Sequence, residues 1–526
     1  MDDTLLEQVE RLATDRGTEQ AFVFEDHTWT RAEVWAEAGH VGRFLCTRGL
    51  DPGDRILLAL PNGPDFLFGF LGAQRAGLVP VPLAPGSGPD RIADIAELAR
   101  ARSALLTDDL RERVLSRCGD RMRRRDVSLF TPGDATGSSS PTALPGAGPG
   151  DLCFIQYTSG STAEPRGVGV THRNLSANLL SLTLGMEITP ADALVSWLPL
   201  HHDMGLILMA LVPFSLGARL VLLESRLGSG ETWLRAIERA RGTLTAAPDF
   251  SYRYVCRHVA ADARFDLSSL RLALNAAEPV RASTLRAFED RFGLHDVMVA
   301  GYGLAEATVG VSTWPSGTPA RVDAHGCVSV GPPLPGVSVR IAPHPAVDPG
   351  PERQGEIEVS GVAATQGYVD NPEATARLLA PDGAVRTGDL GYLDGDGFLY
   401  VTGRAKEMIK YAGRTIAPAE VEEVVDRVAG IRRSAAVGID RGGAEGEALV
   451  VFAELESDAE REAGPADRRA LSREIVRAFI DRFGFRPGRV LLVAPRSLPR
   501  TPNGKIRRGE LRERYLEGWG SLPKPN

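Results

Sequence analysis

The sequence has little lysine, little cysteine and no long hydrophobic run. Its five cysteines are an odd number, are spread over the chain and form no C-x-x-C pair, which argues against a disulfide framework and against a zinc site. The longest apolar stretch, residues 204–218, has fifteen residues and contains a proline. It is too short to span a bilayer and predicts a buried helix. The acidic, amphipathic N-terminus is unlike a signal peptide, so we expect a reducing, cytoplasmic location.

The chain also lacks an excess of positive charge. Sixty Lys plus Arg stand against 68 Asp plus Glu, which gives a formal net charge of −8. This balance supports neither nucleic-acid binding nor attachment to an anionic membrane. With 526 residues, of which 43% are hydrophobic, the chain has the composition of a globular protein and is long enough for several domains.

Short strand-like stretches alternate with amphipathic ones, for example RILLAL with DFLFGFLGAQRAG and ARLVLLE with TWLRAIERARG. This alternation predicts an α/β fold of several layers, with strands buried on both faces. The TRAE motif at 30–33 has the spacing of a capping box and predicts a helix that runs towards Cys46. The Pro-, Gly- and Ser-rich segment 131–150 is either an exposed loop or a linker. We favour the loop, because the strand-like LCFIQY after it continues the same core.

A change of pattern near Arg404 predicts a domain boundary. DGDGFLYVTGR predicts a turn and a strand, and the following segment predicts a new turn and an amphipathic helix. We therefore expect a large multi-layer α/β domain over 1–403, a hinge over 404–406 and a small, mobile α+β lobe over 407–526.

The segment richest in chemistry is YTSGSTAEPRGVGVTH, from Tyr157 to His172. Its glycines let backbone N–H groups approach phosphate oxygens and its hydroxyls add donors, so it is a candidate cradle for a triphosphate. It lacks the G-K-[ST] ending of a Walker loop. A flexible surface loop of Ser and Gly is the alternative interpretation. The candidate phosphate-binding residues are Thr158, Ser159, Gly160, Ser161, Thr162, Arg166 and Gly167.

Seven motifs follow one another along the chain. They are the loop above, WLPLHHDMGL (197–206), LNAAEPV (274–280), GYGLAEAT (301–308), RTGDLGYL (386–393), VTGRAKEMIKYAGR (401–414) and PRTPNGKIRR (499–508). In identity and order they resemble the motifs of the adenylate-forming superfamily, which contains acyl-CoA synthetases, fatty acyl-AMP ligases, luciferases and peptide-synthetase adenylation domains. FIQYTSGST, LPLHHDMGL, APDFSY and DLSSLRLALNAAEPV are most similar to the fatty acyl-AMP ligases.

This resemblance implies a reaction in two steps. A carboxylic acid is activated by ATP, with Mg²⁺ on the phosphates, to an acyl adenylate and pyrophosphate. The acyl group then passes to the phosphopantetheine thiol of an acyl carrier protein. The second step implies that the small lobe swings about Lys406 and presents another face, which carries Lys410.

The resemblance also implies roles for single residues. Tyr302 would stack on adenine, and Glu306 would bind the Mg²⁺ together with Thr162. Asp389 would bind the ribose beside Arg404, although without the motifs either would pass for a solvated turn residue or a surface ion pair. The same resemblance adds Ala276, Ala277, Glu278 and Gly303 to the ATP site, and His202, Met204, Asp249, Asn275 and Gly301 to the acid site.

Two other interpretations of these motifs fail on spacing. His201, His202 and Asp203 are adjacent and cannot all converge on one metal ion, and H-E-x-x-H is absent. The GYG at 301–303 matches the start of a dinucleotide fingerprint, but Glu306 stands where the third glycine is required.

Ala276 departs from the glycine usual in acyl-AMP ligases, and its methyl group would narrow or redirect an acyl tunnel.

The scarcity of lysine gives an argument that does not depend on the family. The chain has only Lys406, Lys410, Lys505 and Lys524, and the first three lie in the hinge region or in the turn-rich TPNGKIRR. An ammonium is a compact charge on a flexible stem that can follow the charge developing on phosphorus, whereas a guanidinium is a planar fork. We therefore predict that Lys505 is catalytic in adenylation.

Two departures from the family pattern bear on the acyl acceptor. Acyl-AMP ligases carry an insertion where only 22 residues separate Thr308 from Gly331, and KEMIKYAGRTIAPAEVE is more similar to CoA ligases and luciferases. CoA is therefore the first alternative to a carrier protein and an amine the second. A binding-only module would require Lys505 and Glu306 to be inert. The N-terminal motifs favour the carrier protein, because surface segments tolerate changes of length.

Overall fold

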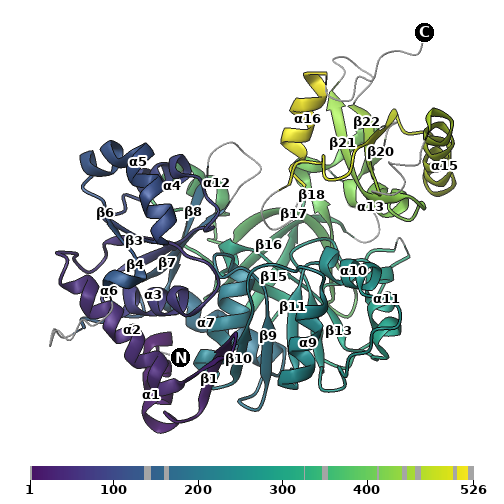
Figure 1. Ribbon diagram of the computed structural model, residues 1–526. Coiled ribbons are helices and arrows are strands. Elements are labelled where there is room, and N and C mark those ends of the chain that lie inside the picture. The colour runs from purple at the N-terminus through teal and green to yellow at the C-terminus, as the bar shows by residue number, and fades with distance from the viewer. Residues whose placement is uncertain are drawn as a thin grey trace.

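The computed structural model describes residues 3–135, 144–158, 165–324, 326–345, 347, 353–411, 414–440, 447–456, 464–500 and 506–518. Helices and several sheets alternate along the chain, which confirms the predicted α/β class (Figure 1). In the described part of the chain, no helix is both long and apolar enough to cross a membrane.

The largest sheet has eight strands in the order β14-β13-β12-β11-β9-β10-β1-β2. Its inner pairs are parallel and its two outermost pairs are antiparallel. The strands are β1 (Gln20–Phe24), β2 (His27–Thr30), β9 (Ala193–Ser196), β10 (Arg219–Leu222), β11 (Leu244–Ala247), β12 (Leu272–Asn275), β13 (Met298–Gly303) and β14 (Gly310–Thr313). The helices between them are α7 (His172–Gly185), η1 (Met204–Leu211), α8 (Val212–Leu216), α9 (Glu231–Ala240), α10 (Asp249–His258), α11 (Ala282–Phe292) and η2 (Ala305–Ala307).

A parallel sheet in the order β4-β3-β5-β6 precedes an antiparallel hairpin of β7 and β8. The strands are β3 (Arg55–Ala59), β4 (Val79–Pro82), β5 (Ser103–Leu106), β6 (Ser128–Phe130), β7 (Leu152–Thr158) and β8 (Arg166–Thr171). The helices are α1 (Leu5–Asp15), α2 (Arg31–Cys46), α3 (Pro64–Arg75), α4 (Pro89–Leu98), α5 (Asp108–Arg124) and α6 (Pro132–Ala135). Phe154 of β7 lies 5.9 Å from Phe70 of α3 between ring centroids, so the strand after segment 131–150 packs into the same core as the helices before it.

Two predicted helices are confirmed. Thr30 and Glu33 form the capping box of α2, in which each side chain accepts from the other residue's backbone N–H. The apolar stretch 204–218 is buried and helical, but its first part, η1, is a π-helix, which composition could not predict.

The rest of the chain forms smaller sheets. An antiparallel sheet in the order β15-β16-β17-β18 follows the large one, and two sheets, β19-β20 and β21-β22-β23, come after it. The elements are β15 (Val337–Ala342), β16 (Gly355–Gly361), α12 (Pro372–Leu378), β17 (Val385–Leu393), β18 (Leu399–Arg404), η3 (Ala405–Glu407), β19 (Ile409–Tyr411), β20 (Arg414–Ile416), α13 (Pro418–Val425), β21 (Ile431–Asp440), β22 (Glu447–Leu455), α15 (Pro465–Phe483), β23 (Arg489–Val493) and α16 (Arg508–Leu516).

The elements after η3 stand apart from the larger body, near α10 (Figure 1). Their apolar side chains form two hydrophobic clusters made entirely of residues from Ile409 onward. A separate core is what a small lobe needs. The hinge at 404–406 and its movement stay predictions.

Candidate functional site

Many of the predicted site residues gather where four parallel strands end. β13, β12, β11 and β9 are neighbours in the large sheet and run in the same direction. The carboxyl ends of parallel strands meet at one edge, where α/β folds bind ligands. The predicted residues that end or follow these strands are His202, Met204, Asp249, Asn275, Ala276, Ala277, Glu278, Gly301, Tyr302, Gly303 and Glu306.

Tyr302, Asp389 and Arg404 form one contact group. Asp389 of β17 and Arg404 of β18 are paired across the strands, and Arg404 Nε lies 2.8 Å from Asp389 Oδ1. The Tyr302 hydroxyl donates to Asp389 Oδ2 at 2.7 Å. Burial, together with the Asp389 charge, raises the pKa of Tyr302 well above its ordinary value, so the phenol remains a donor. A fixed carboxylate can accept hydrogen bonds from ribose hydroxyls, and an aromatic ring beside it can stack on a base, so this group is suited to bind a nucleoside.

Glu306 is joined to the base of the phosphate-loop candidate by Tyr368. The Tyr368 hydroxyl donates to Glu306 Oε1 at 2.7 Å, and the Arg166 guanidinium lies 5.4 Å from the Tyr368 ring centroid. Arg166 and Gly167 begin β8, and Arg166 pairs with Thr158 at the end of β7, so the hairpin holds both ends of the loop. The sequence analysis missed Tyr368. It is 62 residues from Glu306, and no local spacing connects them.

Lys406 lies in η3, two residues after Arg404. Partial burial lowers the pKa of Lys406, and the positive charges of Arg404 and Arg166 lower it further, while Glu407 opposes them. The ammonium therefore lies within electrostatic range of both arginines. Lys410 is exposed on β19, where its backbone N–H donates to Glu447 Oε2 at 2.7 Å.

Five predicted residues lie outside the described residues. They are Ser159, Gly160, Ser161 and Thr162 of the loop, and Lys505. Their roles stay predictions.

The described neighbours of the predicted catalytic lysine are linked to Glu278 through Arg433 and Phe250. Arg500 and Ile506, which flank it, form an antiparallel bridge. Burial and then the charge of Arg433 lower the pKa of Arg500, so the two guanidinium groups lie within electrostatic range of each other. The Arg433 guanidinium lies 5.6 Å from the Phe250 ring centroid, and the Phe250 N–H donates to Glu278 Oε2 at 3.1 Å.

The residues predicted to bind the acid include the start of an apolar helix and a histidine beside an uncharged imidazole. Met204 begins η1, whose residues are all buried. π-Helical turns are rare and are frequent at functional sites. The rings of His201 and His202, directly before this helix, are 4.4 Å apart between centroids. Burial and then His202 lower the pKa of His201 to about 3, so this ring is uncharged at neutral pH.

The turns after β12 and β13 depend on unusual backbone geometry. Ala277 has a φ of +68°, in the left-handed region that a side chain rarely adopts, between the buried Ala276 and the half-buried Glu278. Burial raises the pKa of Glu278, and the charge of Arg433 opposes that rise. At Gly303 a Cβ would lie 1.7 Å from the carbonyl oxygen of Val309, so only glycine fits.

Asp249 and Asn275 form a buried pair beneath this turn. Their exposed fractions are 1% and 0%, and Asn275 Nδ2 donates to Asp249 Oδ1 at 3.0 Å. Asp249 also forms an ion pair with Arg253, 3.1 Å from Oδ2 to Nε, and accepts from the Arg281 N–H at 3.2 Å. These contacts engage both carboxylate oxygens of Asp249, whereas Asn275 Oδ1 is buried without a hydrogen-bond partner among the described residues. The contact of either side chain with an acid stays a prediction.

The residues present fit a Mg²⁺ that has few protein ligands. Mg²⁺ in nucleotide sites is bound by one or two carboxylates together with phosphates and water. Glu306 would supply one carboxylate, and Tyr368 donates to only one of its oxygens. Over the described ranges, no group of three or more His, Cys, Asp or Glu side chains could hold a metal ion without such help.

Comparison with known proteins gives a consistent result. The model of the family described as "AMP-binding enzyme" matches residues 9–369. A Caulobacter vibrioides protein named "Putative acyl-CoA synthetase" is 33% identical, over 93% of this chain and 90% of its own. The long-chain-fatty-acid–AMP ligase FadD26 of Mycobacterium bovis is 30% identical, over 95% of this chain and 93% of its own.

A solved structure from work on fatty acyl-adenylate ligases from E. coli and L. pneumophila has the same fold. The TM-score is 0.85 at 28% identity, and the match covers 98% of each chain. The fold similarity therefore includes the lobe as well as the larger body.

Proposed function

The chain belongs to the AMP-binding enzyme family, and we propose that it activates a fatty or other acyl carboxylic acid with ATP. A carboxylate oxygen attacks the α-phosphorus of ATP, the bond to pyrophosphate breaks, and an acyl adenylate forms. The observation that carries this proposal is the group of Tyr302, Asp389 and Arg404, which lies within electrostatic range of Glu306. This group places residues suited to a nucleoside near Glu306, a residue suited to the Mg²⁺ on the phosphates.

Each residue contributes by binding or by its charge. Tyr302 offers a ring for adenine, and Asp389 accepts hydrogen bonds from the ribose hydroxyls. Arg166 and the loop donate to the phosphates, and Lys505 stabilises the charge that grows on phosphorus. Mg²⁺, held by Glu306, would neutralise the negative charge of the phosphates and of the pyrophosphate that leaves.

We further propose that the adenylate stays bound while the lobe, residues 407–526, turns about the hinge at 404–406 against the domain of residues 1–403. The separate hydrophobic clusters from Ile409 onward support a lobe that moves as a unit. After the turn, the lobe presents Lys410 and a new face to the acyl acceptor.

The acceptor we propose is the phosphopantetheine thiol of an acyl carrier protein. The motifs shared with fatty acyl-AMP ligases and the relative named a fatty-acid–AMP ligase favour it. CoA is the second candidate, because only 22 residues separate Thr308 from Gly331 and because another relative is named an acyl-CoA synthetase. An amine is the third.

Acid-dependent exchange of pyrophosphate into ATP tests the first step. A panel of carboxylic acids, followed by mass spectrometry of the adenylates, would identify the acid. If no acid supports exchange, the protein does not form adenylates and the remaining interpretation is a module that only binds.

A second assay tests the acceptor. With the adenylate formed in place, we expect holo carrier protein to be acylated much faster than free CoA at equal thiol concentration. If CoA reacts as fast or faster, the protein is an acyl-CoA synthetase.

A further inference from the structure

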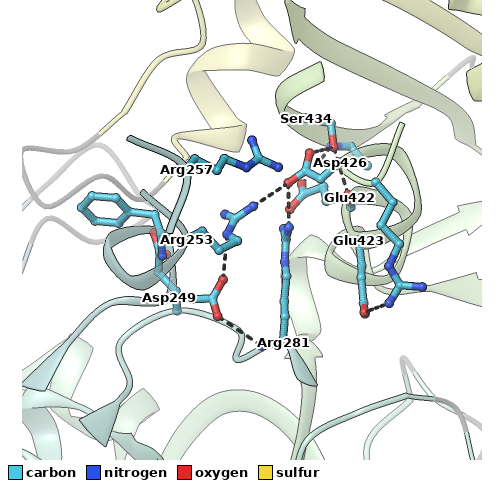
Figure 2. A network of polar contacts seen from close by, with 12 residues as sticks. Asp249, Arg253, Arg257, Arg281, Glu422, Glu423, Asp426 and Ser434 are labelled. Carbon is cyan, nitrogen blue, oxygen red and sulfur yellow. Dashed lines mark hydrogen bonds and ion pairs between the residues drawn. The ribbon is translucent and has the colours of Figure 1, made fainter. Parts of the chain in front are cut away.

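Asp426, next to the end of α13, lies at the contact between the lobe and the larger body (Figure 2). Its side chain is only 3% exposed. Arg253 of α10 and Arg281, the residue before α11, donate from Nη1 to Asp426 Oδ2 at 3.3 and 2.8 Å. Ser434 of the lobe donates from Oγ to the other oxygen, Oδ1, at 2.7 Å. The carboxylate is therefore shared between the two parts of the chain.

Asp249 completes a cluster of four charges. Its side chain is 2% exposed and forms an ion pair with Arg253, while Arg253 and Arg281 are 18% and 15% exposed. Two positive and two negative groups give the cluster no net charge. Burial opposes the charge of Arg281, but Asp426 and Asp249 outweigh it and raise its pKa. While the lobe is docked, each buried charge of the cluster therefore has a partner of opposite sign.

A second set of contacts runs from Asp426 through the lobe. Ser434 Oγ also contacts the Glu422 carbonyl oxygen at 3.3 Å, and Arg508 donates from Nη2 to both Glu422 carboxylate oxygens at 2.8 Å. Arg508 Nη1 donates to Glu407 at 3.0 Å. Glu407 follows the hinge directly, and Arg508 lies three residues after Lys505. The docked helix α13 is thus tied to the hinge and to the segment that carries the predicted catalytic lysine.

We propose that Asp426, clamped by Arg253 and Arg281, is a latch that holds the lobe in the orientation for adenylation and opens for acyl transfer. The proposal rests on the proposed function, because it assumes two steps with different lobe orientations. We infer that this orientation is the adenylating one, because Arg433 of the lobe lies over the Phe250 ring beside Glu278 and is within electrostatic range of Arg500, which precedes the Lys505 segment. Arg253, Arg281 and Asp426 are positioning residues, which act through the placement of the lobe.

The chemistry of the latch allows it to open repeatedly. When the lobe turns, Asp426 and Arg281 exchange each other for water, which solvates both charges well. The net free energy of such a pair is small, because the Coulombic attraction is offset by desolvation. The latch therefore selects an orientation without locking it permanently.

Asp426→Asn tests the latch, because it keeps the shape of the side chain and removes its charge. Without substrates, amide hydrogen exchange over residues 404–408 and over α10 should become faster, on the order of tenfold, since exchange follows the open population. Acid-dependent pyrophosphate exchange should fall on the order of tenfold. Single-turnover transfer from preformed adenylate to the acceptor should stay the same or rise.

Glu423→Gln is the matched control. Glu423 lies on α13, but it pairs with Arg427, four residues on and just past the end of the helix, and not across the interface (Figure 2). It should leave hydrogen exchange and both half-reactions unchanged. Arg281→Gln removes the same cross-lobe contact from the other side and should behave like Asp426→Asn, so the test does not depend on the folding of one variant.

Two results would overturn the latch: equal amide exchange in Asp426→Asn and Glu423→Gln, or an equal loss of both half-reactions. The hydrogen-exchange measurement needs no substrate. If the wild-type protein shows no pyrophosphate exchange with any acid, the proposed function is wrong. If Asp426→Asn nevertheless speeds amide exchange, the Asp426 contact still holds the lobe against the larger body.

Discussion

Replacing Asp389 with asparagine should weaken ATP binding far more than removing its tyrosine partner. Asp389 is 5% exposed and receives Arg404 on Oδ1 and the Tyr302 hydroxyl on Oδ2. In Asp389→Asn, the amide must turn its oxygen to Arg404, because an N–H···H–N contact there would be repulsive. Its NH₂ then faces Tyr302, whose hydroxyl can rotate to accept. The side chain can fit, but the carboxylate that should bind the ribose is gone.

The size of the effect follows from the hydrogen bonds between the ribose and the charged carboxylate. A hydrogen bond to a charged group contributes about 1.5–3 kcal/mol. At about 1.4 kcal/mol per tenfold, this predicts a loss of about ten- to hundredfold in kcat/KM for ATP. Tyr302→Phe keeps the ring and the carboxylate and removes one neutral donor, so its loss should be about threefold to tenfold.

The assay is acid-dependent pyrophosphate exchange as a function of ATP concentration, with both variants measured at a saturating acid concentration. Thermal unfolding of each variant checks that the fold is intact. If Asp389→Asn stays within threefold of the wild type, or if Tyr302→Phe is the more damaging change, the carboxylate does not bind the ribose and the nucleoside lies elsewhere.

Three further changes test the remaining parts of the site. Lys505→Ala should lower pyrophosphate exchange by on the order of 10²–10³, as the loss of a charge-stabilising donor does, while the melting temperature stays the same; exchange within threefold of the wild type would contradict its catalytic role. Lys406→Pro should affect adenylation and acyl transfer unequally, as measured in separate half-reactions, and an equal loss would argue against a hinge. Ala276→Gly should shift the preference in an acid panel towards longer or bulkier acids, by about 1–3 kcal/mol; an unchanged profile would place the acyl tunnel elsewhere.

Local signals in the sequence predicted local structure well. The capping box of α2 needs only four adjacent residues, and both of its hydrogen bonds are present. The buried helix after His202 follows from its apolar composition. Its π-helical geometry does not, because the i→i+5 pattern leaves no mark on composition.

Contacts between distant segments were beyond the sequence analysis. Tyr368 reaches Glu306 over 62 residues, and Asp426 reaches Arg281 over 145. Neither Tyr368 nor Asp426 belongs to a motif that could draw attention to it. A single sequence shows which residue types occur together along the chain, whereas these pairs depend on how the strands and the lobe come together in space.

Motif resemblance identified positions whose contacts within the fold it could not predict. Asp249 was assigned to the acid site because APDFSY resembles an acyl-AMP ligase motif. In the structure, its carboxylate is occupied by Asn275, Arg253 and the N–H of Arg281. Through Arg253 it supports the contact with the lobe, so a motif residue next to a site can serve the site by holding its parts together.

The unequal use of the two basic residues now has a structural explanation. Arg281, Arg404 and Arg508 pair with carboxylates, and Arg508 grips both oxygens of Glu422. Such pairs suit a planar guanidinium, which remains charged when buried and offers several donors in a fixed geometry. Lys406, in contrast, has a pKa lowered by burial and by two neighbouring arginines, and no described contact fixes its ammonium to a single carboxylate. This difference fits the prediction that lysine occupies positions where a positive charge changes its surroundings during the reaction, whereas these arginines hold fixed ion pairs.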